Sequence, residues 1–117
     1  MPLQTLFREG IIVGGSSDAP VVTCSPFAVM ASAVERHLSD GSIHRPNERI
    51  SIRQALLMWT RGAAYLCHTE NTCGKIAAGA WADYIIIDTP LLSASADEIR
   101  HTRVLHTILG GKTVYQI

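Results

Sequence analysis

The sequence predicts an α/β protein, with helices in the first part of the chain and strands in the last part. A short apolar run, residues 11–13, is bounded by glycines and has the character of a buried strand. Two segments between Ser25 and Leu66 carry apolar residues at helical spacing. From Tyr84 onward, β-branched and aromatic residues gather in short runs that end at Gly, Pro or Asp.

Length and composition limit the possible partners. The 117 residues allow one ordinary domain or parts of two, and the 47% hydrophobic content is typical of a chain that forms a core. The net charge of zero offers no basic field for nucleic acid or for an anionic membrane surface. The start has no signal-like apolar core, and no apolar run approaches the roughly 20 residues of a membrane helix. We therefore predict a cytoplasmic protein with neither kind of partner.

The first candidate for chemistry is Asp18, in the loop after the predicted strand. Gly14, Gly15 and Pro20 force the chain to turn there, so the carboxylate would project from the strand end. Barrels of the α/β class keep their catalytic groups at this position. The alternative is a purely structural turn, in which the Asp18 side chain bonds its own backbone.

Two helices follow. Ser25 and Pro26 form a good helix start, and Gly41 is the expected end, followed by a loop over residues 42–49. Five residues share the apolar face of this first helix: Phe27, Met30, Ala31, Val34 and Leu38. On its other face, Arg36 could reach a substrate carboxylate, although solvent exposure or an ion pair is the simpler interpretation.

The second helix begins with a capping-box pattern formed by Ser51 and Gln54. Its apolar residues surround much of the helix, which predicts burial between other elements. The helical pattern continues to Leu66 with a break near Gly62, and the small Ala63-Ala64 pair would allow close packing.

The last part of the chain reads as β structure. Residues 84–87 form the first expected strand, and a short helical turn is possible at residues 96–99. Strands at 104–109 and 113–117 are joined by Gly110-Gly111 in a tight hairpin. Asp83, at the entry to the first of these strands, is expected to anchor a turn rather than to pair with Asp18.

The cysteines offer a separate possibility. Cys24, Cys67 and Cys73 are an odd number in a chain without a secretory signal, so a disulfide framework is not expected. Together with His68 they could supply four zinc ligands, although their spacing matches no Cys-x-x-Cys pair. A small zinc-stabilised binding module is therefore kept as an alternative function.

Taken in order, these segments resemble the C-terminal part of metal-dependent amidohydrolases. They are most similar to the branch that hydrolyses exocyclic amides and N-substituted formamides. The residues that carry the resemblance are Ser17-Asp18-Ala19-Pro20-Val21, Ala33-Val34-Glu35-Arg36, Ile50-Ser51-Ile52-Arg53-Gln54-Ala55-Leu56, Thr60, Ala63-Ala64, the run from Gly74 to Asp88, Val104, Thr107, Gly110-Gly111-Lys112 and Val114-Tyr115.

The resemblance implies a fold and a role for Asp18. Residues 1–70 would be the last strand and C-terminal helices of a (β/α)8 barrel, and residues 71–117 would be strands of the accompanying small β-sandwich. Asp18 matches the acidic residue at the end of the eighth strand. It would bind a divalent metal, expected to be zinc, and would handle the proton of the attacking water. The substrate would be a small molecule with a non-peptide C–N amide bond.

The resemblance also implies that much of such an enzyme lies outside this sequence. The barrel's first seven strands are missing, and with them the His-x-His pair and the bridging carboxylate or carbamylated lysine. No His-x-His pair is formed by His37, His44, His68, His101 or His106. A complete barrel needs roughly 250 residues. We therefore expect a C-terminal fragment. It is either active when a longer polypeptide or companion subunit supplies the rest, or an inactive truncated fragment prone to self-association.

Overall fold

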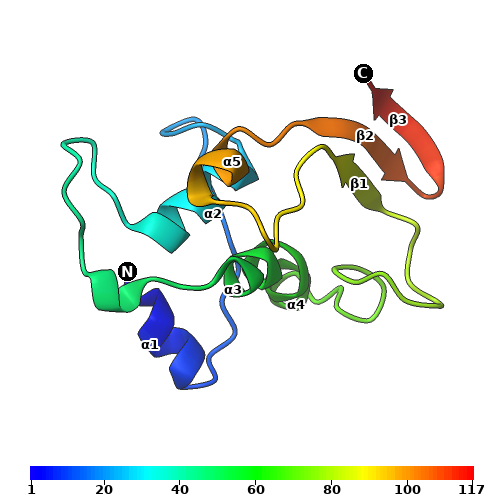
Figure 1. The fold of residues 1–117 in the computed structure, drawn as a ribbon. Helices are drawn as coiled ribbons and strands as arrows, with labels where there is room; N and C mark the ends of the chain where they lie inside the picture. The colour runs from blue at the N-terminus through cyan, green and yellow to red at the C-terminus, as the bar shows by residue number, and fades with distance from the viewer.

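The computed structural model describes residues 1–117 as a group of helices with a three-stranded sheet to one side (Figure 1). Helices and strands thus both form, as the α/β prediction requires. The elements in chain order are α1 (Leu3–Arg8), α2 (Pro26–Glu35), the 3-10 turn η1 (Pro46–Glu48), α3 (Ile52–Leu57), the π-helical segment η2 (Met58–Gly62), α4 (Ala63–Leu66), β1 (Tyr84–Ile87), α5 (Ala96–Arg100), β2 (Val104–Leu109) and β3 (Lys112–Gln116).

Helix α2 starts as predicted and ends earlier than predicted. The Ser25 hydroxyl accepts a hydrogen bond from the Ala28 amide, which confirms Ser25 as the N-cap. The prediction that the helix runs to Gly41 is wrong. It ends at Glu35, and Arg36 adopts a left-handed conformation with φ of 60°. Leu38 consequently lies outside the helix and is exposed, because the chain has already turned away from the core.

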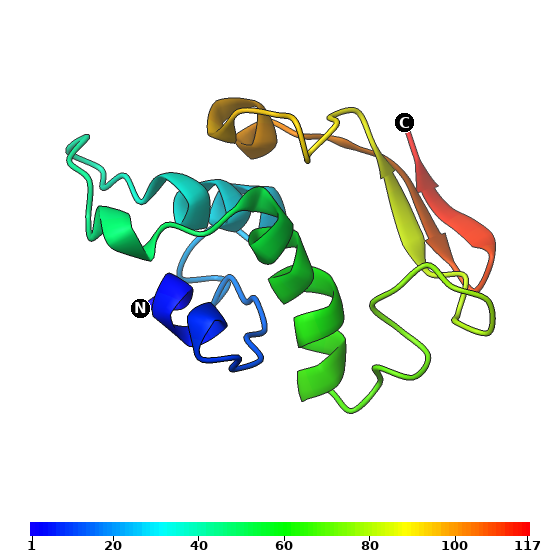
Figure 2. The same cartoon turned by 60° about the horizontal axis from the view of Figure 1, so that its bottom comes forward.

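The segments α3, η2 and α4 follow one another as one helical rod (Figure 2). The capping box at its start is confirmed: Ser51 accepts from the Gln54 amide, and the Gln54 side chain accepts from the Ser51 amide. The predicted break near Gly62 is a π-helical stretch that ends at that residue. None of the helices has the length and apolar character needed to cross a membrane.

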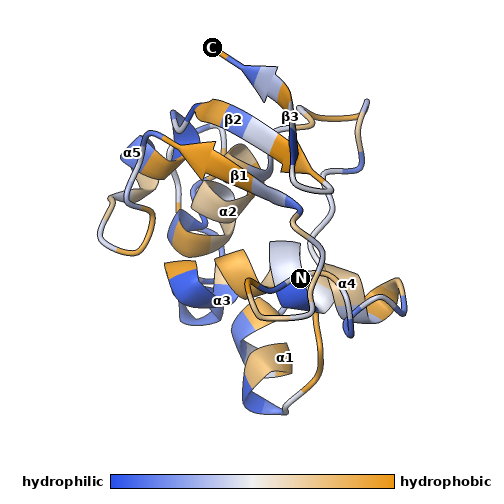
Figure 3. Cartoon of the chain, turned by 90° about the vertical axis from the view of Figure 1, so that its right-hand side faces the viewer, coloured by the Kyte–Doolittle hydropathy of each residue, from blue (hydrophilic) through white to orange (hydrophobic).

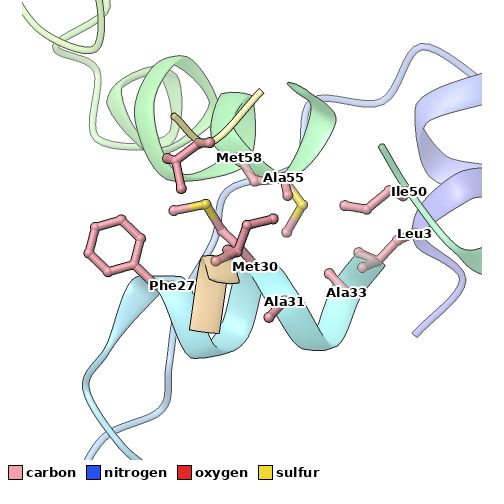
Figure 4. Packing of buried hydrophobic residues seen from close by; sticks show 10 residues of the cluster. Leu3, Phe27, Met30, Ala31, Ala33, Ile50, Ala55 and Met58 are labelled. Carbon is pink, nitrogen blue, oxygen red and sulfur yellow. The ribbon is translucent and has the colours of Figure 1, made fainter. Parts of the chain in front are cut away.

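The hydrophobic core lies between the helices (Figure 4). Helix α2 contributes four of its ten residues, and the rod contributes Ala55 and Met58. Ile99 of α5 is completely buried against this cluster. The full set is Leu3, Phe27, Met30, Ala31, Ala33, Ile50, Ala55, Met58, Leu91 and Ile99. Three of the five residues predicted for the apolar face of α2 are thus in the core, and Val34 packs against it while partly exposed.

The sheet is antiparallel with the order β1-β2-β3. Its strands match the prediction closely, and both hairpin glycines have positive φ values, 55° and 76°, which a tight two-residue turn requires. Much of β1 and β2 is made of hydrophobic residues (Figure 3), yet Ile108 is the one strand residue that is buried. The possible helical turn at residues 96–99 is the short helix α5, whose start has its own capping box between Ser95 and Glu98.

The predicted strand over residues 11–13 does not form. The chain has neither helix nor strand from residue 11 to residue 17, and the amides of Ile12 and Val13 donate no backbone hydrogen bond. A strand exists only through pairing with a neighbouring strand, and the three strands of this chain pair with one another. The apolar side chains of Ile11 and Ile12 are therefore about half exposed, at 51% and 48%.

Candidate functional site

Asp18 lies in an exposed turn whose backbone is held by neighbouring serines. The Ser16 hydroxyl accepts from the Asp18 amide and the Ser17 hydroxyl accepts from the Ala19 amide, both at 3.3 Å. The Val21 amide donates to the Asp18 carbonyl at 3.0 Å. Asp18 itself has a positive φ of 55°, a conformation that Asp tolerates better than most residues because its short polar side chain can bond locally.

The Asp18 carboxylate takes no part in holding this turn. Neither of its oxygens has a hydrogen bond or an ion pair, and the residue is exposed. The interpretation as a turn closed by the aspartate's own side chain is therefore wrong, since the two serine hydroxyls perform that function. The carboxylate remains free to meet another group.

The segment before Asp18 is attached to the helical rod. The Gly15 amide donates to the Met58 carbonyl at 2.9 Å, and the Val13 carbonyl lies directly against Gly62. Gly14 lies against Leu66, and Gly15 lies against the Trp59 ring. In Figure 1 the blue chain leaving α1 passes the rod before it reaches the loop beside α2. The rod therefore positions the root of the Asp18 turn.

A divalent metal fits this chain only in part. Asp18 offers oxygen donors of the kind that metals use, but no three residues among the His, Cys, Asp and Glu side chains form a group able to hold an ion. None of the five histidines joins Asp18 in such a group. The residues of this chain thus do not bring together three such ligands for a metal site.

The four residues of the alternative zinc site do not come together either. Cys24, Cys67 and Cys73 are free thiols, and no metal-binding group includes them or His68. Cys24 lies just before α2, whereas the other three lie at and beyond the end of α4. The zinc-module hypothesis is therefore wrong for this fold, because the tertiary structure does not bring these four residues together in one metal-binding group.

Arg36 does not form the ion pair considered for it. Its Nε donates to the His44 carbonyl at 3.1 Å, and its Nη1 donates to the Met1 carbonyl at 3.2 Å. It forms no ion pair. The side chain ties the loop after α2 to the start of the chain.

Asp83 anchors the hairpin, as predicted. Its Oδ1 accepts a hydrogen bond from the Gly110 amide at 2.6 Å, and the neighbouring Ala82 carbonyl accepts from the Gly111 amide at 3.0 Å. These contacts connect the entry of β1 to the turn between β2 and β3. Asp83 is thus committed to the turn and is not paired with Asp18.

Two carboxylates with structural roles could not be recognised from the sequence. Glu48 is 7% exposed and accepts from both the Thr5 amide at 3.0 Å and the Thr5 hydroxyl at 2.6 Å, which lowers the pKa of the carboxyl below its ordinary value. Asp88 accepts from the backbone amide and Nε of Arg103, each at 2.9 Å, and these bonds lower its pKa to about 2. Both stay ionised at neutral pH and hold segments together.

A cavity of about 570 Å³ lies beside the unpaired segment rather than at Asp18. Ile11, Ile12 and Val13 form one side, and Leu57 and Tyr65 of the rod form another. Three charged residues, Arg61, Glu70 and Lys75, also line it. Asp18 is not among the lining residues, so this cavity and the candidate catalytic carboxylate are separate features of this chain.

Comparison with known proteins agrees with the resemblance seen in the sequence. The sequence model of the amidohydrolase family matches residues 1–115. The chain is 28% identical over 116 residues to the putative amidohydrolase YtcJ of Bacillus subtilis, and covers 22% of that protein. It is 30% identical over 115 residues to the N-substituted formamide deformylase of Arthrobacter pascens, and covers 21% of it. These alignments include 97% and 98% of this chain, which therefore spans about a fifth of the relatives' length.

The fold recurs inside larger solved structures. An amidohydrolase from Thermotoga maritima aligns with 98% of the chain at a TM-score of 0.69 and 17% identity, and the match covers 26% of that structure. E. coli guanine deaminase aligns with 98% of the chain at a TM-score of 0.72 and 20% identity, with 30% of that structure covered. The order of motifs, the matched fold and the family match over nearly every residue lead to one conclusion: this chain belongs to the amidohydrolase family.

Proposed function

We propose that this chain is the C-terminal part of an amidohydrolase that cleaves a non-peptide C–N bond, and that its contribution to the chemistry is Asp18. The observation that carries the proposal is the family match over residues 1–115. It is supported by the exposed Asp18 carboxylate, which has no hydrogen bond or ion pair in this fold. Residues 1–70 would serve as the last barrel strand and following helices, and residues 71–117 as part of the small β-sandwich.

The substrate class we propose is a small N-substituted amide, with formamides as the first choice. One relative at 30% identity is named an N-substituted formamide deformylase, and this supports that choice. The overall reaction adds water across the C–N bond, so that a carboxylic acid and an amine are released. A longer polypeptide or a companion subunit would supply the remainder of the barrel and the pocket.

The proposed role of Asp18 is proton transfer. Its carboxylate would accept a proton from the attacking water and donate it to the departing amine nitrogen, for which it needs a free oxygen. A divalent metal such as zinc, held by ligands from outside this chain with Asp18 as one contributor, would supply activation of the water when bound. The serine hydroxyls of the turn already satisfy the local amides, so Asp18 is not required for holding the backbone.

The test is hydrolysis of p-nitroformanilide by the assembly that contains this chain, followed through the release of p-nitroaniline and formate. We expect Asp18→Asn to lower kcat at least a hundredfold, because the amide cannot accept the proton while the shape of the side chain is retained. The matched control is Asp97→Asn, the same chemical change at an exposed aspartate in α5, which should keep kcat within twofold. Equal turnover in the Asp18→Asn variant and the parent would disprove the assignment.

Metal content measured on the same samples separates two explanations of inactivity. Loss of bound metal in Asp18→Asn but not in Asp97→Asn would support a ligand role for Asp18. Absence of both metal and turnover in every preparation would contradict the proposal and favour an inactive fragment.

A further inference from the structure

The π-helical segment η2 contacts the irregular segment, residues 12–17, that leads to Asp18. The Met58 carbonyl accepts two hydrogen bonds, one from the Ala63 amide within the rod and one from the Gly15 amide at 2.9 Å. The second bond is the one backbone hydrogen bond that attaches residues 12–17 to the rest of the protein. The position of the Asp18 turn therefore depends on the surface of η2.

Gly62, the last residue of η2, makes this close approach possible. A methyl group on Gly62 would overlap the Val13 carbonyl oxygen and would lie 3.0 Å from its carbon atom. The φ of Gly62 is −64°, which is ordinary for a helix, so the backbone conformation does not require glycine. A glycine inside a helix costs about 1 kcal/mol relative to alanine, and here the reason for its presence is the neighbouring carbonyl group.

The opposite side of the contact is equally restricted. A side-chain carbon on Gly15 would lie 2.7 to 2.9 Å from three atoms of the Trp59 indole ring. Gly62 of the rod thus contacts the backbone of Val13, and Gly15 contacts the Trp59 ring of the rod. Because neither glycine has a side chain, the segment over residues 13–15 packs directly against the rod. Only Ser16 and Ser17 lie between Gly15 and Asp18 in the chain. A displacement of the Gly15 backbone should therefore also displace the Asp18 carboxylate.

We propose that Gly62 is a positioning residue. Because it has no side chain, the Val13 carbonyl can pack against the rod, and this close contact sets the distance between the rod and the Asp18 turn. The contact itself is independent of any activity, and its catalytic consequence rests on the proposed role of Asp18. A displacement of about 1 Å of a reacting group can lower a rate on the order of a hundredfold, so a methyl group at Gly62 should affect catalysis strongly.

The test compares Gly62→Ala with Ile99→Val, a mild core change in α5 that controls for general loss of stability. In the 117-residue chain, hydrogen exchange of the Gly15 amide should be at least tenfold faster in Gly62→Ala. The Ile99 amide, bonded to the Ser95 carbonyl, should keep its exchange rate. In the assembly that hydrolyses p-nitroformanilide, Gly62→Ala should lower kcat at least tenfold with KM within twofold, and Ile99→Val should leave kcat unchanged.

Each outcome decides the matter. Unchanged Gly15 exchange in Gly62→Ala, or equal acceleration in Ile99→Val, would overturn the proposal. So would an unchanged kcat in Gly62→Ala where Asp18→Asn abolishes turnover. If Gly15 exchange accelerates as expected but Asp18→Asn has no effect on turnover, Gly62 stands as the positioning residue and the proposed function fails. Should Gly62→Ala not fold, Gly15→Ala introduces the same displacement from the other side, through Trp59, and carries the same expectations.

Discussion

The helical unit and the sheet differ sharply in how they are stabilised. The helices enclose a cluster of ten buried residues that come from α1, α2, the rod, α5 and the connecting segments. The sheet contributes one buried residue, Ile108, and Tyr84, Ile85 and Ile86 of β1 are each between 44% and 46% exposed. The first region has a core of its own, whereas the second is held mainly by strand pairing and turn contacts.

This difference leaves the sheet much less covered than the helical unit. Sheets of three strands are stable when one face is covered, and here no helix crosses either face of the sheet. The Cα radius of gyration is 14.8 Å, compared with about 13 Å for a compact domain of this length. The exposed sheet and the unpaired segment at residues 11–17 agree with the proposal that a larger protein supplies their neighbours.

The largest expected effect is a core deletion in the helical unit. We expect Ile99→Ala to lower the free energy of unfolding by about 2–5 kcal/mol, because its side chain is fully buried and leaves a cavity. The same change at Ile86, which is 45% exposed, should cost about 1 kcal/mol. Urea unfolding of both variants measures the contrast. An equal loss at Ile86 would mean that the sheet is covered in solution.

Acid is expected to lower the free energy of unfolding by a smaller amount, and to do so in both the helical unit and the sheet. The pKa of Glu48 is lowered by its bonds from Thr5, and the pKa of Asp88 is lowered from an ordinary 3.8 to about 2 by its bonds from Arg103. Because both groups bind protons more readily when unfolded, their stabilisation is complete above the ordinary pKa values. It is lost as pH falls through the lowered ones.

Urea midpoints measured from pH 6 to pH 2 should therefore fall below about pH 4. When unfolding is followed at the sheet, Asp88→Asn should reduce the dependence of the urea midpoint on pH. When unfolding is followed at α1, Glu48→Gln should do the same. A decline of unchanged steepness in the double variant would show that other carboxylates control acid unfolding.

The smallest effect concerns the hairpin. Asp83→Ala removes the acceptor for the Gly110 amide and should cost about 0.5–1.5 kcal/mol, the usual value of one hydrogen bond. Hydrogen exchange of Gly110 and Gly111 should accelerate, while amides of α2 should keep their rates. Faster exchange in α2 would indicate that the two regions unfold together rather than separately.

Local features of the fold were predictable from the sequence. Ser25 and the Ser51–Gln54 pair begin their helices because the caps satisfy amides within three residues. The Gly110-Gly111 hairpin and its anchor Asp83 were equally recognisable, since a two-residue turn demands positive φ values. Gly62 carried a signal as a glycine inside an apolar helical pattern, but the sequence could not indicate the Val13 carbonyl as its cause.

The features that depend on distant contacts could not be predicted. Glu48 holds Thr5, which lies 43 residues away, and no pattern connects them. Arg36, in a left-handed conformation at the early end of α2, donates to the carbonyls of Met1 and His44, which lie 35 and 8 residues away. Residues 11–13 have the composition of a buried strand but remain unpaired, because a strand needs a neighbour that the rest of the chain does not provide.

The sequence by itself determined the helix starts, the hairpin, the family and Asp18 as the candidate carboxylate, because these depend on neighbouring residues or on the order of motifs. Only the tertiary structure decided that the Asp18 side chain takes no part in the turn, that the cysteines do not form a site, and that the Val13 carbonyl lies against Gly62. Such contacts join segments far apart in the chain, and their geometry exists only after the helices have packed.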